Sequence, residues 1–175
     1  AEALAILRKD IEAHGFALTT GIFGTKYLLD VLSTEGMEEL AGRLVARREF
    51  PGWGYMLDSG ATTLWETWKP SDNTYSQNHP MFGSVEEWLM KHALGITVPE
   101  DAVGCDRVVI RPKPVAGLTW AKGEYRSAKG PIRVDWSLAG GKMRLAVEVP
   151  RGVRARVWLA DKRQWAEVGS GRHEW

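Results

Sequence analysis

Residues 132–149 read IRVDWSLAGGKMRLAVEV, and this stretch decides the fold of the second half of the chain. Apolar residues occupy every second position on both sides of the pair Gly140-Gly141. An alternation with period two is typical of a half-buried strand, and a Gly-Gly pair suits the two-residue turn of a β-hairpin. The stretch therefore predicts an antiparallel hairpin with one buried face.

The same alternation continues on both sides of this hairpin, over residues 106–175. Further short apolar runs surround Val108, Trp120, Val157 and Trp165, and Gly or Pro residues separate them. Gly123 is expected to break the strand that contains Trp120. Five or six short strands with such turns predict an antiparallel β-sandwich.

Upstream of these strands, the apolar residues follow a helical period up to Gly95. Four helices are expected: one around 4–11, one over 19–34, one around 37–45 and one over 79–94. The hydroxyl of Thr19 or Thr20 is expected to cap the second helix. The first part of the chain is therefore predicted to be mainly helical.

Two connecting segments stand out by composition. Residues 50–60 contain Pro51 and three glycines, which predict a loop or a short strand. Residues 96–105 contain Pro99 and Gly104, and we interpret them as the linker between the helical part and the β part.

The helix expected over 19–34 is apolar on more than one side, around Ile22, Phe23, Leu28 and Leu32. A helix that is apolar over most of its surface needs partners on several sides. The first part therefore looks like a portion of a larger helical assembly, and these faces are expected to be partly uncovered in the isolated chain or covered by a second copy.

Composition excludes several classes of protein. The 175 residues are 44% hydrophobic and 26% charged, which excludes intrinsic disorder. A net charge of +1 offers no support for a nucleic-acid partner, and no apolar run approaches the roughly 18 residues of a membrane span. Cys105 is the single cysteine, and the four histidines are not paired at ligand spacing, so neither a metal nor a cofactor is expected.

The stretches 52–56 and 60–68 concentrate aromatic residues around one carboxylate. Glu66 lies between Trp65 and Trp68, and Trp53 lies a few residues upstream. Indole rings suit sugar-binding platforms as well as large cores, and a carboxylate beside them can accept a proton from water. The alternative is a surface acid in a tryptophan-rich turn that only packs. His79 is either a sugar contact or simply the residue that starts a helix.

Several motifs together resemble bacterial α-L-rhamnosidases. They are LTTGIFGTKYLL at 18–29, PGWGYM at 51–56, GATTLWETW at 60–68, the pair Asn78-His79 followed by Phe82-Gly83, VIRP at 109–112 and GLTWAK at 117–122. Their order and spacing extend from the helical part into the strands, and the combination is far more specific than any single motif.

The resemblance implies an α+β chain in two parts. Residues 1–98 would be the last helices of an α/α (six-hairpin) barrel catalytic domain, and residues 106–175 the C-terminal antiparallel β-sandwich. The family hydrolyses terminal α-L-rhamnosides with inversion, and its general acid lies in an upstream segment that this chain does not contain. The isolated chain is therefore expected to be inactive.

The resemblance also implies the roles of individual residues. Glu66 matches the general base, and His79, Trp53 and Trp65 match positions that line the sugar site. The implied partners are rhamnose-containing glycosides or polysaccharides, without nucleic acid, membrane, metal or cofactor, and exposed barrel helices could drive self-association. The protein would be bacterial, and the cytoplasm and the periplasm both stay open, because no leader is visible at Ala1 although one could have been cleaved or lie upstream.

Two other interpretations stay open beside the enzyme fragment. The chain could be a non-catalytic carbohydrate-binding or structural remnant of the same family that kept the tryptophan-rich pocket. It could also be a structural β-sandwich with helices attached, although its helices should then be self-sufficient. The presence of Glu66 favours the enzyme lineage, because a lectin does not require a base at that position.

Overall fold

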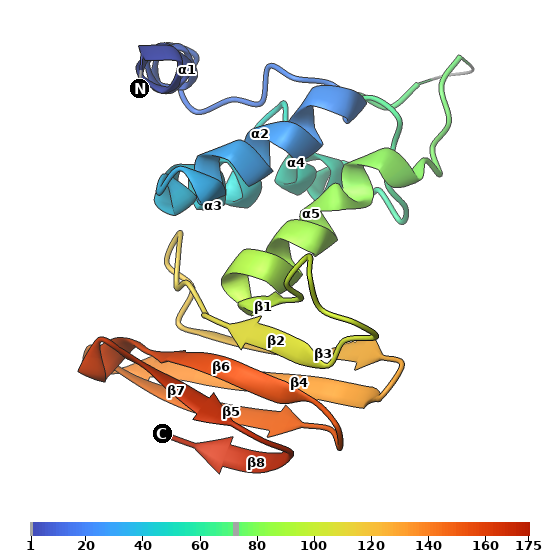
Figure 1. Cartoon of the computed structure of the whole chain (residues 1–175). Helices are drawn as coiled ribbons and strands as arrows, with labels where there is room; N and C mark the ends of the chain where they lie inside the picture. The colour runs from blue at the N-terminus through green and yellow to red at the C-terminus, as the bar shows by residue number, and fades with distance from the viewer. Residues whose placement is uncertain (1, 72–73) are drawn as a thin grey trace. The chain divides into compact units, whose positions relative to one another are not determined.

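The computed structural model describes residues 2–71 and 74–175 (Figure 1). The chain divides into two compact units, Ala1–Glu87 and Trp88–Trp175, and each is described by itself. Helices make up the regular structure of the first unit and strands most of that of the second, as the hydrophobic periods predict.

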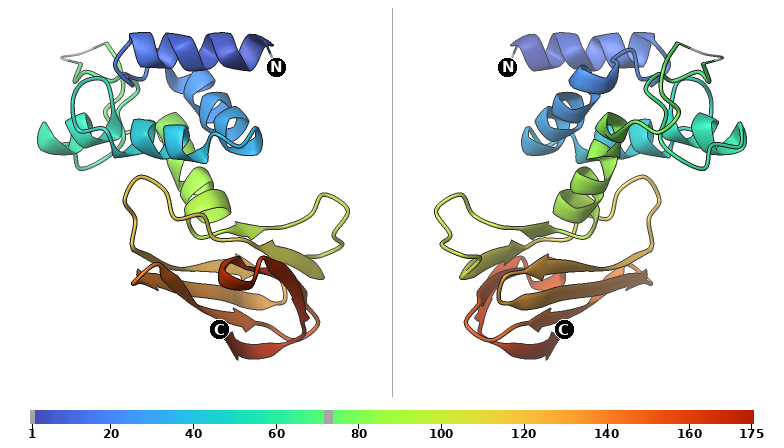
Figure 2. Two further views of the ribbon diagram at one scale, coloured as in Figure 1. Left: turned by 90° about the vertical axis from the view of Figure 1, so that its left-hand side faces the viewer. Right: turned by 90° about the vertical axis from the view of Figure 1, so that its right-hand side faces the viewer.

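The first unit contains the predicted helices and one that was not predicted. Its helices are α1 (Glu2–Ala13), α2 (Ile22–Thr34), α3 (Glu38–Ala46), α4 (Trp53–Asp58) and η1 (Pro80–Gly83), and η1 leads directly into α5 (Ser84–Trp88). α2 and α3 pack side by side, as Figure 2 shows. No helix in the described parts of the chain is long and apolar enough to cross a membrane.

The helix α4 corrects the prediction of a loop or short strand at 50–60. A Cβ atom at Gly54 would lie 2.6 Å from the carbonyl oxygen of Arg47 and 2.7 Å from the Cα atom of Arg48. The glycine therefore lets the helix backbone approach the preceding segment closely, whereas the sequence analysis interpreted it as a helix breaker.

The start of α2 also differs from the prediction. Gly21 is the N-cap residue, and no side chain caps the helix. The hydroxyl of Thr20 instead lies 2.9 Å from the hydroxyl of Thr25, which donates to the carbonyl oxygen of Gly21 at 2.8 Å. The Thr20 hydroxyl therefore interacts with a side chain of the first turn and not with a backbone N–H group.

The second apolar face of α2 is open, as expected around Phe23, but Leu32 does not belong to it. Leu32 is fully buried together with Leu29. Phe23 and Tyr27 are 72% and 66% exposed, and Val31 continues the same stripe one turn later. Positions i, i+4 and i+8 share one helix face, so a second apolar stripe lies uncovered on this helix.

The second unit is a sandwich of two four-stranded sheets (Figure 2). One sheet has the order β1-β2-β6-β7 and the other the order β3-β4-β5-β8. The strands are β1 (Ile96–Thr97), β2 (Arg107–Ile110), β3 (Trp120–Ser127), β4 (Gly130–Ala139), β5 (Lys142–Val149), β6 (Arg154–Leu159), β7 (Gln164–Val168) and β8 (Gly171–Glu174), with a short turn η3 (Ala160–Lys162) before β7.

The hairpin predicted at 132–149 is confirmed. β4 and β5 pair antiparallel with Ala139 opposite Lys142, and both glycines of the turn have positive φ. Residues Val134 and Trp136 pair with Val147 and Leu145 on the buried face. The alternation in the sequence therefore placed both strands in the correct register.

Three features of the sandwich correct the sequence analysis. β2 and β6 run parallel, so the sandwich is not wholly antiparallel. β1 falls inside the predicted linker 96–105, because Ile96 pairs with Ile110 and is buried. β3 continues through Gly123, where a Cβ atom would lie 2.7 Å from Cδ2 of Leu94, so this glycine makes room for a core side chain.

A buried tryptophan joins the helical end of the second unit to its sheets. The five-residue turn η2 (Leu89–Ala93) ends just before Leu94 and Gly95, which has a φ of +86°. Trp136 is fully buried, and its Nε1 donates to the carbonyl oxygen of Ala93 at 2.9 Å. The indole thereby donates to a carbonyl oxygen at a helix end, where carbonyl groups lack an N–H donor within the helix.

Candidate functional site

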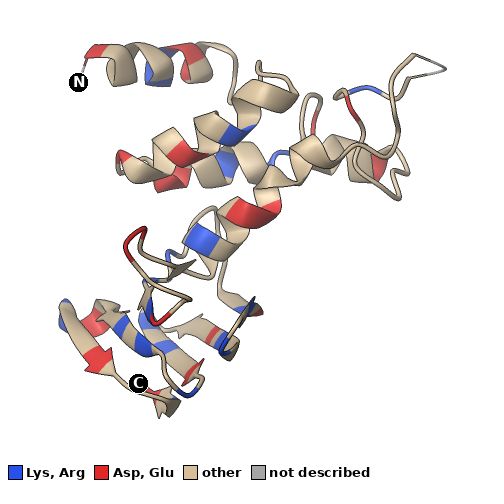
Figure 3. Ribbon diagram, turned by 45° about the vertical axis from the view of Figure 1, so that its right-hand side comes forward, with Lys and Arg blue, Asp and Glu red and all other residues tan. Residues whose placement is uncertain are grey.

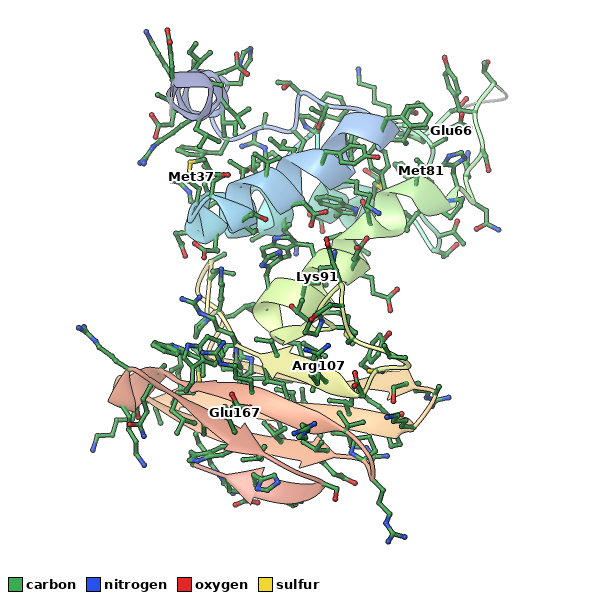
Figure 4. The ribbon with its side chains drawn as sticks, in the orientation of Figure 1. Met37, Glu66, Met81, Lys91, Arg107 and Glu167 are labelled. Atoms are coloured by element: carbon green, nitrogen blue, oxygen red, sulfur yellow. The ribbon has the colours of Figure 1, made fainter. Side chains whose placement is uncertain are left out.

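A loop between α4 and η1 brings Glu66 and His79 together. The N–H group of Glu66 donates to the carbonyl oxygen of Ser76 at 2.9 Å, and that of His79 donates to the carbonyl oxygen of Leu64 at 2.8 Å. The Thr63 hydroxyl adds a hydrogen bond to the carbonyl oxygen of the residue after Ser76. These bonds hold two arms of the loop against each other, and Figure 4 shows Glu66 on this loop.

The carboxylate of Glu66 is oriented by the opposite arm. Its Oε2 accepts a hydrogen bond from the backbone N–H of Ser76 at 2.9 Å. Nδ1 of His79 lies 3.9 Å from the same oxygen. The side chains of Glu66 and His79 are 29% and 26% exposed, so the pair is partly shielded but reachable from solvent.

The imidazole of His79 has an unsatisfied nitrogen. His79 is the N-cap residue of η1 and makes no side-chain cap, and Pro80 follows it at the first position. Its Nε2 is buried and has no hydrogen-bond partner within the described part of the chain. Because a buried polar atom without a partner is costly, such atoms are concentrated where a further group binds.

The structure does not place Trp53 and Trp65 as open platforms. Both are buried, and Nε1 of Trp53 donates to the carbonyl oxygen of Phe82 at 3.0 Å. Trp53 meets Trp68 edge to face, with a centroid distance of 5.1 Å. Trp53 therefore lies in an aromatic cluster with Trp68 and Phe82, and Trp65 is buried in the same unit.

Trp68 was missed as a site residue. It is buried, stacks on Phe82 at a centroid distance of 3.8 Å, and donates from Nε1 to the carbonyl oxygen of Thr20 at 2.8 Å. Trp68 follows Glu66 by two residues in the chain. Its hydrogen bond therefore connects the segment that contains Glu66 to Thr20, just upstream of α2. Its position in the same tryptophan-rich motif was the signal in the sequence that could have identified it.

Acidic and histidine side chains do not form a metal centre in residues 2–71 and 74–175. No three His, Cys, Asp or Glu side chains in those residues come together as metal ligands could. Glu66 and His79 offer an acid–base group and a hydrogen-bonding group side by side. A carboxylate oriented by a backbone N–H can take a proton from a water molecule.

Two sequence models of protein families cover nearly the whole chain. The bacterial α-L-rhamnosidase six-hairpin glycosidase domain matches residues 1–93. The chain belongs to the bacterial α-L-rhamnosidase family. The model of the bacterial α-L-rhamnosidase C-terminal domain matches residues 95–174.

Curated α-L-rhamnosidases align with most of the chain. That of Streptomyces avermitilis is 38% identical over 159 residues, which are 85% of this chain and 15% of that protein. That of Alteromonas sp. strain LOR is 31% identical over 79% of this chain and 16% of its own length. The chain therefore spans about a sixth of the length of the curated relatives that it matches.

Solved α-L-rhamnosidase structures have the same fold over nearly the whole chain. The Streptomyces avermitilis α-L-rhamnosidase complexed with L-rhamnose matches with a TM-score of 0.88 and 34% identity, covering 96% of this chain and 19% of that one. The α-L-rhamnosidase from Dictyoglumus thermophilum also gives 0.88, at 29% identity, covering 98% of this chain and 22% of that one. The prediction of barrel helices followed by a β-sandwich is thereby confirmed for this member of the bacterial α-L-rhamnosidase family.

Proposed function

We propose that this chain is the C-terminal part of an inverting α-L-rhamnosidase in which Glu66 is the general base. The observation that carries the proposal is the hydrogen bond from the Ser76 N–H to Oε2 of Glu66. It holds the carboxylate in one orientation beside His79 in a partly exposed loop. The substrate class would be terminal α-L-rhamnosides, in glycosides or polysaccharides.

The proposed chemistry is a single displacement. Glu66 removes a proton from a water molecule while the oxygen of that water attacks the anomeric carbon. A general acid protonates the departing glycosidic oxygen. Inversion requires the two carboxyl groups to be about 6.5–9.5 Å apart, so that the water fits between sugar and base. Oε1 of Glu66 accepts no hydrogen bond from the described residues, which leaves this oxygen for the proton.

The other residues of the site would bind and enclose the sugar. His79 would hydrogen-bond a sugar hydroxyl, and the partial exposure of its side chain beside Glu66 supports this contact. Trp53 and Trp65 would form an apolar layer behind the sugar, because both are buried in the unit that carries the loop.

We further propose how the chain is divided and completed. Residues 1–98 would be the end of the barrel domain and residues 106–175 the accessory β-sandwich. The general acid would come from a segment outside these 175 residues, so the isolated chain is expected to turn over little or no rhamnoside. The uncovered stripe around Phe23 and Tyr27 would contact the remaining barrel helices or, in the isolated chain, a second copy.

The test is a Glu66→Gln substitution in an α-L-rhamnosidase whose C-terminal part has been replaced by these residues. The amide keeps the shape of the side chain but accepts no proton, so kcat on an aryl α-L-rhamnoside is expected to fall roughly 10²- to 10⁴-fold. Glu49→Gln is the matched control, because it removes an exposed acid from the same unit. NMR of the first product formed should show the inverted anomer.

Two results would overturn this assignment. Equal turnover by the wild-type protein and the Glu66→Gln variant would remove Glu66 from the role of base. Turnover by the isolated 175-residue chain, lost in its Glu66→Gln variant, would show that an acid within these residues completes the pair.

A further inference from the structure

The near-neutral chain separates its charges between the two units. Residues 88–175 contain sixteen Lys and Arg against nine Asp and Glu, whereas residues 1–87 contain seven against thirteen. The net charges are therefore +7 and −6, and Figure 3 shows where the basic and acidic residues lie on the ribbon. The β-sandwich is a basic unit, a property that the overall charge of +1 hides.

Part of the positive charge of this unit lies on the outer face of the sheet β1-β2-β6-β7. In the parallel pair of β2 and β6, Arg107 lies opposite Arg154, and Val109 lies opposite Arg156. The alternate residues of both strands point into the core and are buried. Strand periodicity therefore places three arginines on the outer face, and Arg111 follows directly after β2.

Two tryptophans hold two of these arginines, Arg111 and Arg156, in place. Trp158 and Trp165 are cross-strand partners whose rings meet at a centroid distance of 5.1 Å. The guanidinium of Arg111 lies 5.4 Å from the Trp158 ring, and that of Arg156 lies 4.4 Å from the Trp165 ring. Cation–π contacts hold both guanidinium groups over the sheet, so that they lose less conformational freedom when they bind a ligand.

Nearby carboxylates neutralise only some of these arginines. Arg107 pairs with Asp101 at 3.2 Å, and Arg156 pairs with Glu167 at 3.4 Å. Among the described residues, Arg111 and Arg154 have no carboxylate within ion-pair distance. Their two charges therefore remain available on an otherwise ordered surface, beside Arg107 and Glu167, which Figure 4 labels.

The outer face of the other sheet is different, because its charges are mostly paired. Arg133 bridges Glu124 and Glu148 at 2.7 and 2.9 Å. Lys122 faces Asp135 at 3.4 Å across the same strands. The two unpaired arginines and the tryptophan pair that contacts one of them are therefore on the sheet β1-β2-β6-β7.

We propose that the arginine–tryptophan face, formed by Arg111, Arg154, Arg156, Trp158 and Trp165, binds a carboxylated polysaccharide. Guanidinium groups donate paired hydrogen bonds to carboxylates, and indole faces pack on the C–H groups of sugar rings. A row of guanidinium groups along two strands matches a ligand with regularly repeated charge. The choice of an acidic glycan over a nucleic acid rests on the proposed rhamnosidase function.

This surface would hold an acidic, rhamnose-containing polymer while the Glu66 site acts on its side groups. The contacts are exposed, so each is worth little alone. Loss of one arginine is expected to weaken binding about two- to fivefold, and binding is expected to weaken further at high salt, because ions screen exposed charges.

The test measures binding of the 175-residue chain to polygalacturonate by affinity electrophoresis, without any turnover. The Arg111→Gln and Arg154→Gln variants should each bind more weakly. Arg144→Gln is the matched control, because it removes one exposed strand arginine from the other sheet. Trp165→Ala should also weaken binding, whereas Trp120→Ala, on the other sheet, should not. Thermal unfolding of each variant shows whether the fold is kept.

Two further ligands make the outcome decisive. Methyl-esterified polygalacturonate keeps the rings and loses the charge, so it should bind poorly. A single-stranded oligonucleotide that binds as well as polygalacturonate, with the same response to the variants, would show a general polyanion surface and overturn the proposal. So would equal loss in the Arg144→Gln and Arg154→Gln variants, or no retardation by polygalacturonate. Because no turnover is measured, these results stand apart from the Glu66 assay.

Discussion

Replacing Trp68 with Ala is expected to destabilise the first unit by about 3–5 kcal/mol, the usual cost of deleting a large aromatic side chain from a core. The structure accounts for this size. The ring stacks on Phe82 at 3.8 Å and meets Trp53 edge to face, and each such pair is worth about 0.5–1.5 kcal/mol beyond burial. The hydrogen bond to the Thr20 carbonyl oxygen adds about 0.5–1.5 kcal/mol.

A second variant separates packing from hydrogen bonding. Trp68→Phe keeps much of the ring area but loses the N–H donor, so its expected cost is about 1–2 kcal/mol. The assay is urea unfolding followed by far-UV circular dichroism. Trp120→Ala is the control, because Trp120 is 65% exposed and should change stability by no more than about 0.5 kcal/mol.

The Trp120→Ala control sets the loss of stability with which Trp68→Ala is compared. If Trp68→Ala lowers the free energy of unfolding by no more than Trp120→Ala does, the aromatic cluster does not hold the loop that carries Glu66. The proposed role of the cluster as the wall of the sugar site would then have to be abandoned.

Three further predictions follow from packing, charge and exposure. Gly54→Ala should destabilise the first unit by more than about 2 kcal/mol in urea unfolding, because its Cβ atom would lie 2.6 Å from a backbone oxygen; Gly169→Ala, with open space around it, should not. Hydrogen bonds from Arg126 and Arg133 lower the pKa of Glu124. The stabilisation that the ionised carboxylate contributes is therefore lost as pH falls through that lowered pKa. Glu124→Gln should flatten the dependence of the urea midpoint on pH below about pH 5. Phe23→Ser with Tyr27→Ser should shift the isolated chain from dimer towards monomer in sedimentation equilibrium, and an unchanged distribution would exclude this stripe as a contact between copies.

Much of the fold was predictable because local periodicity reports which face of an element is buried. The alternation around Gly140-Gly141 specified both the hairpin and its register. The two-sided apolar pattern of residues 19–34 correctly indicated a helix with an open face, although Leu32 was assigned to the wrong side. A residue near the boundary between two apolar stripes can pack on either neighbour, and the helical period alone does not choose.

The candidate site was predictable only in part. The motif around Glu66 and the pair at residues 78–79 were visible in the sequence, but the hydrogen bonds that bring Glu66 beside His79 join segments about ten residues apart. Trp53 and Trp65 were predicted to line the sugar site, and the structure adds that both rings are buried. An indole has the same sequence signature in both roles, since the difference lies in what packs against it.

The sequence by itself determined the helical first part, the strand-rich second part and the family to which the chain belongs. These properties depend on residue periodicity and on motif order, which are local or linear features of the chain. The tertiary structure alone decided that β2 and β6 run parallel, that Gly54 and Gly123 lie inside regular elements, and that two arginines contact two tryptophans on one sheet face. Each of those depends on which distant segment packs alongside, and this is set by the free energy of burying the whole core rather than by any single stretch of residues.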